Sequence, residues 1–131
     1  MISVEENRRV FEEILFILTH NDLDMFFDVC DDLKNESKYQ VIPLYMKKEY
    51  EQLCIKYEAC FEQLQECFTT YCANFIPPFD NFDKKEQFEQ YNKLIDTANK
   101  IMDFQSLVAN KFVEIDSYRV NYRKRLTLVK G

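Results

Sequence analysis

Cysteine has the widest range of chemistry in this 131-residue chain, because a thiol can bind a metal, form a disulfide or act as a nucleophile. One predicted helix contains Cys54, Cys60, Cys67 and Cys72. Since a helix turns by about 100° per residue, Cys60 and Cys67 share one face, whereas Cys54 and Cys72 share another. This excludes a single tetrahedral zinc site within the helix, and no CxxC pair is present. We predict no metal and no cofactor, with the thiols as small buried side chains; a redox role or an intermolecular disulfide is the alternative.

Other catalytic arrangements are also missing from the sequence. The only glycine is Gly131, which excludes the glycine-rich loops that bind phosphates. The single histidine, His20, falls at a predicted helix C-terminus, where a protonated imidazole suits the helix dipole. Paired carboxylates such as Asp31-Asp32 fall on a polar face, where they cannot work as an acid and base pair. We therefore predict a protein that is not an enzyme and has no small-molecule substrate.

Cations gather near the C-terminal end of a chain whose net charge is -6. Residues 117–131 contain Lys and Arg but no Asp or Glu, so the rest of the chain is more acidic than the total. The candidate anionic docking residues are Arg119, Tyr122, Arg123, Lys124 and Arg125. Such a segment can bind phosphates, stack on bases or dock on an anionic membrane. The alternative is a helix C-terminus carrying the cations that its dipole favours.

The elements that position these residues are predicted to be helices. One glycine and three prolines provide few turn signals, which favours long elements. Ser3 and Glu6 fit a capping box, Pro43 suits the start of a helix, and Pro77-Pro78 must end one. Apolar residues recur three and four positions apart between these signals. The predicted helices cover about 4–20, 23–34, 44–75 and 84–125.

The two long helices each carry an apolar stripe with coiled-coil spacing. We predict that these stripes form a helical seam that binds a partner, through Tyr50, Leu53, Tyr57, Cys60, Leu64, Leu94, Ile101 and Val108. Two long helices joined by a short turn pack antiparallel by default. The predicted fold is a single all-α domain over residues 1–131. In it, two short N-terminal helices pack on a long antiparallel coiled-coil-like helical hairpin, which makes four helices.

The functional prediction is a non-enzymatic protein–protein interaction or assembly module, acting as a homodimer or as a subunit of a larger complex. The alternative is a nucleic-acid or anionic-membrane accessory protein that uses the basic C-terminal segment. Neither a signal peptide nor a transmembrane span is recognised, so we expect an intracellular protein, cytoplasmic or nuclear, with reduced thiols. The predicted architecture is similar to that of small helical subunits in kinetochore, vesicle-tethering and viral accessory assemblies.

Overall fold

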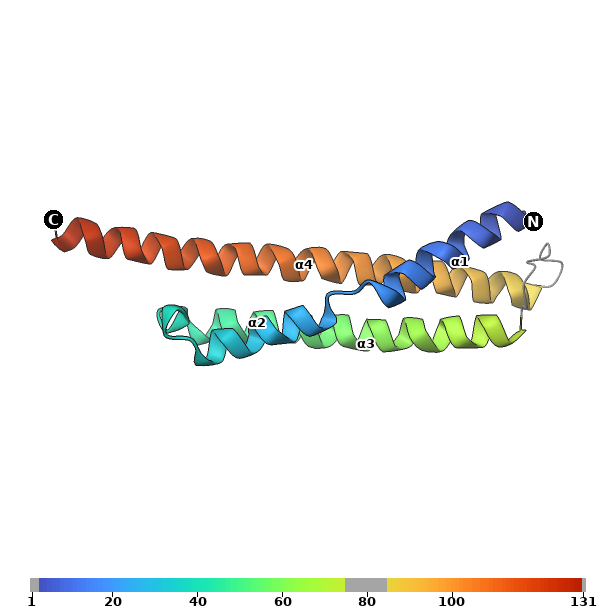
Figure 1. Ribbon diagram of the computed structural model, residues 1–131, viewed down its shortest axis with the longest axis horizontal. Helices are drawn as coiled ribbons and strands as arrows, with labels where there is room; N and C mark the ends of the chain where they lie inside the picture. The colour runs from blue at the N-terminus through green and yellow to red at the C-terminus, as the bar shows by residue number, and fades with distance from the viewer. Residues whose placement is uncertain (1–2, 75–84, 131) are drawn as a thin grey trace. The chain divides into compact units, whose positions relative to one another are not determined.

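The described part of the chain is helical apart from short connections. The structure, a computed structural model, describes residues 3–74 and 85–130, with side chains for 3–73 and 88–124. Its elements in chain order are α1 (Val4–Thr19), α2 (Leu23–Asn35), the short 3-10 helix η1 (Ser37–Tyr39), α3 (Leu44–Asn74) and α4 (Lys85–Lys130) (Figure 1). No strand occurs within these described ranges, which confirms the predicted all-α class.

The helix boundaries follow local signals in the sequence. The Glu6 amide donates to Ser3 Oγ at 3.1 Å, which caps the start of α1. The Met46 amide donates to the Pro43 carbonyl at 3.1 Å, so Pro43 directly precedes α3. The last helix continues to Lys130 rather than ending near residue 125. The predicted turn at Pro77-Pro78 lies outside the described residues.

The chain forms two compact units, and each is built from two separate stretches of sequence. Unit 1 comprises Met1–Asn21 and Glu58–Met102, and unit 2 comprises Asp22–Tyr57 and Asp103–Gly131. The two long helices contribute one part to each unit, because α3 passes from unit 2 into unit 1 and α4 passes back again. That residues 1–131 form a single domain stays a prediction.

Unit 1 packs α1 against parts of both long helices around an apolar core. Val10 and Ile14 of α1 are buried, as is Leu64 of α3. Phe11 of α1 contacts Phe68 of α3 with ring centroids 5.1 Å apart. The buried residues that α4 supplies to this unit are Tyr91, Leu94, Thr97, Ala98 and Ile101. Burial of these faces is the main stabilising contribution, since isolated helices of this length are marginal in water.

Unit 2 packs α2 and η1 against the first part of α3 and the later part of α4. The Phe26 ring of α2 meets the Tyr57 ring of α3 edge to face, with centroids 5.1 Å apart. Tyr50 of α3 and Phe112 of α4 form a second aromatic contact at 6.4 Å. The other fully or nearly buried side chains of this core are Cys30, Leu33, Tyr39, Ile42, Met46, Cys54, Val108 and Ile115.

Side chains at the break between α1 and α2 bind other parts of the chain. Asp22 occupies the N-cap position of α2, but its side chain makes no capping bond. Its carboxylate accepts a hydrogen bond from Gln105 Nε2 at 2.8 Å, which ties α2 to α4 within unit 2. His20 is the C-cap of α1, and Asn21 Nδ2 donates to the Leu18 carbonyl.

Candidate interaction surface

The predicted partner-binding seam lies in the interior of the two units. Unit 2 contains Tyr50, Leu53, Tyr57 and Val108, and unit 1 contains Cys60, Leu64, Leu94 and Ile101. All of these side chains except Leu53 are buried, and Leu53 is half-buried. The seam residues therefore pack within their own chain. That they also bind a partner stays a prediction, which would require the partner to displace these contacts.

The predicted docking cations lie on the last part of α4. Arg119 is held by Asp116, since its Nε and Nη2 atoms donate to Asp116 Oδ1 at 3.2 and 2.9 Å. Tyr122, Arg123 and Lys124 are exposed. Arg125 belongs to the helix, but its side chain lies outside the described residues. The arrangement keeps one guanidinium in a local ion pair and presents the next aromatic and cationic side chains at the surface.

The same part of α4 presents exposed apolar side chains. The exposed surface of α4 is defined here by Leu107, Val113, Tyr118, Val120 and Tyr122, with exposed fractions from 37% to 62%. Ile115 is the last buried residue among those described, and none of residues 116–124 is buried. Val113 and Val120 lie seven residues apart, so they share one face of the helix. The helix thus continues beyond the core of its unit with apolar groups in contact with water.

An acidic surface lies on α2 of the same unit, and it includes the Asp31-Asp32 pair that was predicted to fall on a polar face. Asp24, Asp28, Asp31 and Asp32 are all exposed, whereas Phe26, Cys30 and Leu33 are buried on the opposite side of the helix. Lys34, near the end of the same helix, forms an ion pair with Glu51 of α3 at 2.8 Å. This contact raises the pKa of Lys34 through the hydrogen bond and the charge of Glu51. Unit 2 therefore carries both an acidic helix face and a cationic helix end.

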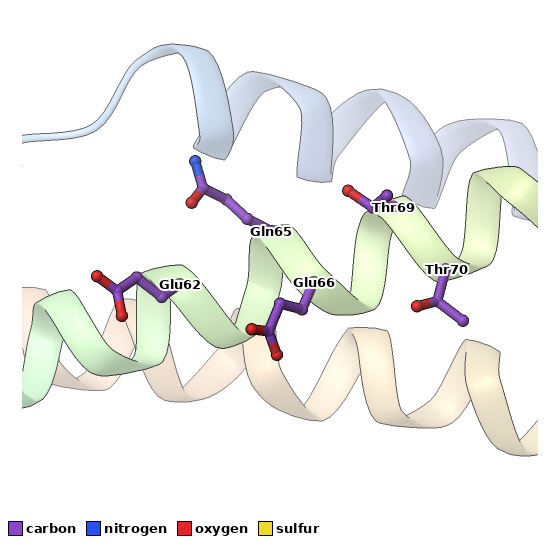
Figure 2. Close-up of a pocket in the computed structure, with 5 residues that line it drawn as sticks. All are labelled: Glu62, Gln65, Glu66, Thr69 and Thr70. Carbon is purple, nitrogen blue, oxygen red and sulfur yellow. The ribbon is translucent and has the colours of Figure 1, made fainter.

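A hollow on unit 1 is lined by polar side chains of α3 alone. Its residues are Glu62, Gln65, Glu66, Thr69 and Thr70, and its volume is about 560 Å³. Figure 2 shows all five projecting from successive turns of this one helix. Because the side chains come from a single exposed helix surface, they do not converge on a point as donors in a binding site do.

The residues considered for chemistry are spread over the structure. Within residues 3–74 and 85–130, no three His, Cys, Asp or Glu side chains form a group that could hold a metal ion. The His20 ring stacks on Phe16 at 4.3 Å, and its Nδ1 lies 2.9 Å from Thr19 Oγ1. The buried Cys60 thiol donates to the Thr97 carbonyl at 3.7 Å, and burial raises its pKa.

Two buried pairings were not foreseen from the sequence. In unit 1 the Tyr71 hydroxyl donates to Asn7 Oδ1, while Asn7 Nδ2 is buried without a hydrogen-bond partner. In unit 2 the Cys30 thiol lies 3.6 Å from the Cys54 sulfur. Asn7 precedes Val10 and Ile14 by three and seven residues, so its position on the apolar stripe of α1 was a usable signal. No spacing rule links Cys30 to Cys54, because they lie on different helices.

The exposed surface of α4, with the exposed cations Arg123 and Lys124 beside it, is the feature of the described residues that best suits binding. None of the helices in that part has a stretch long and apolar enough to cross a lipid bilayer. Similarity to other proteins adds no further guide: no protein-family model matches the chain, and no curated protein or solved structure is similar to it.

Proposed function

We propose that this chain is a non-enzymatic protein–protein interaction or assembly module that binds through helix packing on the exposed surface of α4. The observation that carries the proposal is the helix beyond Ile115, where no residue of 116–124 is buried. A short stretch of helix is marginal in water without packing along an apolar face. Val113 and Val120, which share one face of α4, supply apolar groups for such packing. A partner helix laid on them would remove these groups from water.

The partner in this proposal is a second copy of the chain or another subunit of a complex. Charge favours a partner that has an acidic surface, because α4 presents the cations Arg123 and Lys124 beside its exposed apolar side chains. The acidic face of α2 has the matching sign, so a homodimer can satisfy this requirement. In this proposal, α3 and α4 form a coiled-coil-like antiparallel hairpin, and α1 and α2 pack on it. The hairpin is the scaffold that carries the binding surface. The proposal assigns the protein to the cytoplasm or nucleus, where thiols stay reduced.

Substitution on the exposed surface tests the proposal. Val120→Glu puts a charge on the apolar face and should lower self-association in analytical ultracentrifugation, or the recovery of stoichiometric partners after affinity purification with nuclease. Ile55→Glu is the matched control, because Ile55 is 49% exposed on α3 and outside this surface. A wild-type chain that stays monomeric and recovers no partner contradicts the proposal. So does a Val120→Glu variant that associates as the wild type does.

A second candidate function is binding to nucleic acid or to an anionic membrane through the cationic end of α4. The favouring observation is that Tyr122, Arg123 and Lys124 follow one another at the surface. This function predicts binding to an oligonucleotide, or to vesicles containing phosphatidylserine, that weakens steeply with salt. Replacing Arg123, Lys124 and Arg125 together by alanine should abolish it. Binding that does not change with salt, or absent binding, rules it out.

A further inference from the structure

The buried cysteine pair of unit 2 joins two helices at a place where a covalent bond could form. Cys30 is on α2 and Cys54 is on α3, and the two sulfur atoms lie 3.6 Å apart. The exposed fraction is 5% for Cys30 and 0% for Cys54. A disulfide requires a sulfur–sulfur distance of about 2.05 Å, so side-chain rotation has to close roughly 1.5 Å. Burial of both thiols holds them together and keeps other thiols away.

We propose that Cys30 and Cys54 are a redox-active pair that hydrogen peroxide converts to an intramolecular disulfide between α2 and α3. Nothing in the proposed binding function of α4 uses these residues. The pairing differs from the cysteine arrangement considered along α3, because one partner comes from α2. The bond would link two cysteines that are 24 residues apart in the chain, and so it would hold α2 onto the core of unit 2.

The surroundings of the pair differ for the two sulfur atoms. The hydrogen bond with Cys54 lowers the pKa of Cys30, and this effect outweighs burial and the charge of Glu51, which act in the opposite direction. The hydrogen bond with Cys30 and burial raise the pKa of Cys54. The Cys54 thiol also donates a hydrogen bond to the Phe26 carbonyl at 3.8 Å, and this contact favours the protonated form of Cys54. Cys30 is also the more exposed of the two, at 5% against 0%, so peroxide reaches it first: Cys30 is the attacking thiol, and Cys54 is the thiol that resolves the intermediate.

The reaction balances with one molecule of hydrogen peroxide. The Cys30 thiolate attacks one peroxide oxygen, the O–O bond breaks, and the released hydroxide takes up the Cys30 proton to give water and a sulfenic acid. The Cys54 sulfur then attacks the Cys30 sulfur, the S–O bond breaks, and hydroxide leaves with the Cys54 proton as a second water. Two thiols lose two electrons and two protons, and the peroxide is reduced to two waters.

The test oxidises the folded, reduced full chain with hydrogen peroxide, blocks the remaining thiols with N-ethylmaleimide under denaturing conditions, and maps the disulfides by mass spectrometry. We expect the mass before alkylation to fall by two hydrogen atoms, three of the five cysteines to be alkylated, and one linked peptide pair to contain Cys30 and Cys54. The oxidised protein should also melt at a higher temperature than the reduced protein. Cys60→Ser, which removes a buried thiol of unit 1, should retain both results.

Two serine variants separate the steps. Cys54→Ser should leave a sulfenic acid on Cys30 that dimedone traps, and Cys30→Ser should give neither the disulfide nor the higher melting temperature. Five alkylated cysteines after oxidation of the folded wild type would overturn the proposal and leave the pair as two packed thiols. A disulfide that joins Cys67 or Cys72 of two chains would overturn it as well. Because the wild-type map decides the main point, the proposal stays testable even where a variant fails to fold.

Discussion

In unit 1, Tyr71 of α3 reaches a buried asparagine of α1, whereas in unit 2 the nearest equivalent contact between α3 and a short helix joins two thiols. An amide or hydroxyl that loses its partner inside a core costs about 1–3 kcal/mol of stability. A thiol behaves as a small apolar group with weak hydrogen bonding. The comparison teaches that the contact between α1 and α3 in unit 1 depends on one buried hydrogen bond, while the contact between α2 and α3 in unit 2 depends on shape.

The largest effect on stability is expected from substitutions that remove apolar volume from the core of each unit. Ile101→Ala in unit 1 and Ile115→Ala in unit 2 each delete a buried side chain with an exposed fraction of 1% or less. Each should lower the free energy of unfolding by about 2–5 kcal/mol, because the cavity cannot fully collapse. Urea denaturation measures the loss, and Val113→Ala on the exposed surface is the control. A loss below about 1 kcal/mol for either isoleucine would show that its unit lacks a packed core.

The next prediction tests the buried hydrogen bond between α1 and α3 in unit 1. Tyr71→Phe removes the hydroxyl that Asn7 Oδ1 accepts from, which leaves the whole buried amide unpaired. We expect a loss of about 1–3 kcal/mol in the free energy of unfolding. Adding Asn7→Leu to this variant should recover part of the loss, since both polar partners are then gone. A double-mutant cycle in urea measures the coupling, and additive single effects would contradict the hydrogen bond.

A third effect follows from the buried tyrosines of both units. Burial raises the pKa of Tyr50 in unit 2 and of Tyr71 in unit 1 above the ordinary value of 10.0. Their hydroxyls hold the proton more tightly in the folded than in the unfolded state, so their stabilising contribution is complete below pH 10.0 and is lost as the pH rises toward the folded pKa. Each tyrosine contributes a slope of about 1.4 kcal/mol per pH unit in that range. Tyr50→Phe should reduce the slope of stability against pH, and Tyr45→Phe, at an exposed position, should not.

The smallest expected effect concerns the surface contacts of unit 2. Lys111 Nζ lies 2.8 Å from Glu49 of α3 and 3.1 Å from Glu114, and these carboxylates raise its pKa. Lys111→Met keeps the aliphatic stem and removes the charge, so we expect a loss of about 1 kcal/mol or less, decreasing with added salt. Thermal unfolding at low and high salt measures it. A loss larger than that of Tyr71→Phe would reverse the comparison between the two units.

The helical class and the helix starts could be predicted because their causes are local. Ser3 caps its own helix and Pro43 directly precedes the next, so each signal acts within a turn of its position. Gln105 is a polar residue that interrupts the apolar stripe of α4. The structure gives the reason, since its amide binds Asp22 on another helix. That partner is distant in sequence, and periodicity carries no information about it.

The interaction surface was predicted less well for a related reason. The seam was identified from apolar spacing, which marks side chains that leave water but does not say whether the cover is the same chain or a partner. Leu94 and Val108 have exposed fractions of 0% in the chain itself. The exposed groups Val113 and Val120 lie off that stripe, and so the seam pattern gave no sign of them. The cations beside them were visible in the sequence because charge clusters need no structural context.

The division of the chain between units also has a consequence for its synthesis. A ribosome releases the chain from the N-terminus onward, so unit 1 has all its residues once residue 102 has emerged. Residues 22–57 cannot complete unit 2 until residues 103–131 have been synthesised. The contact between Tyr50 and Phe112 forms only after that last segment is made. The nascent chain therefore exposes the apolar faces of unit 2 during this interval. A premature stop codon after residue 102 would yield a chain with a complete unit 1 and only the first segment of unit 2, whose apolar faces would stay exposed to water.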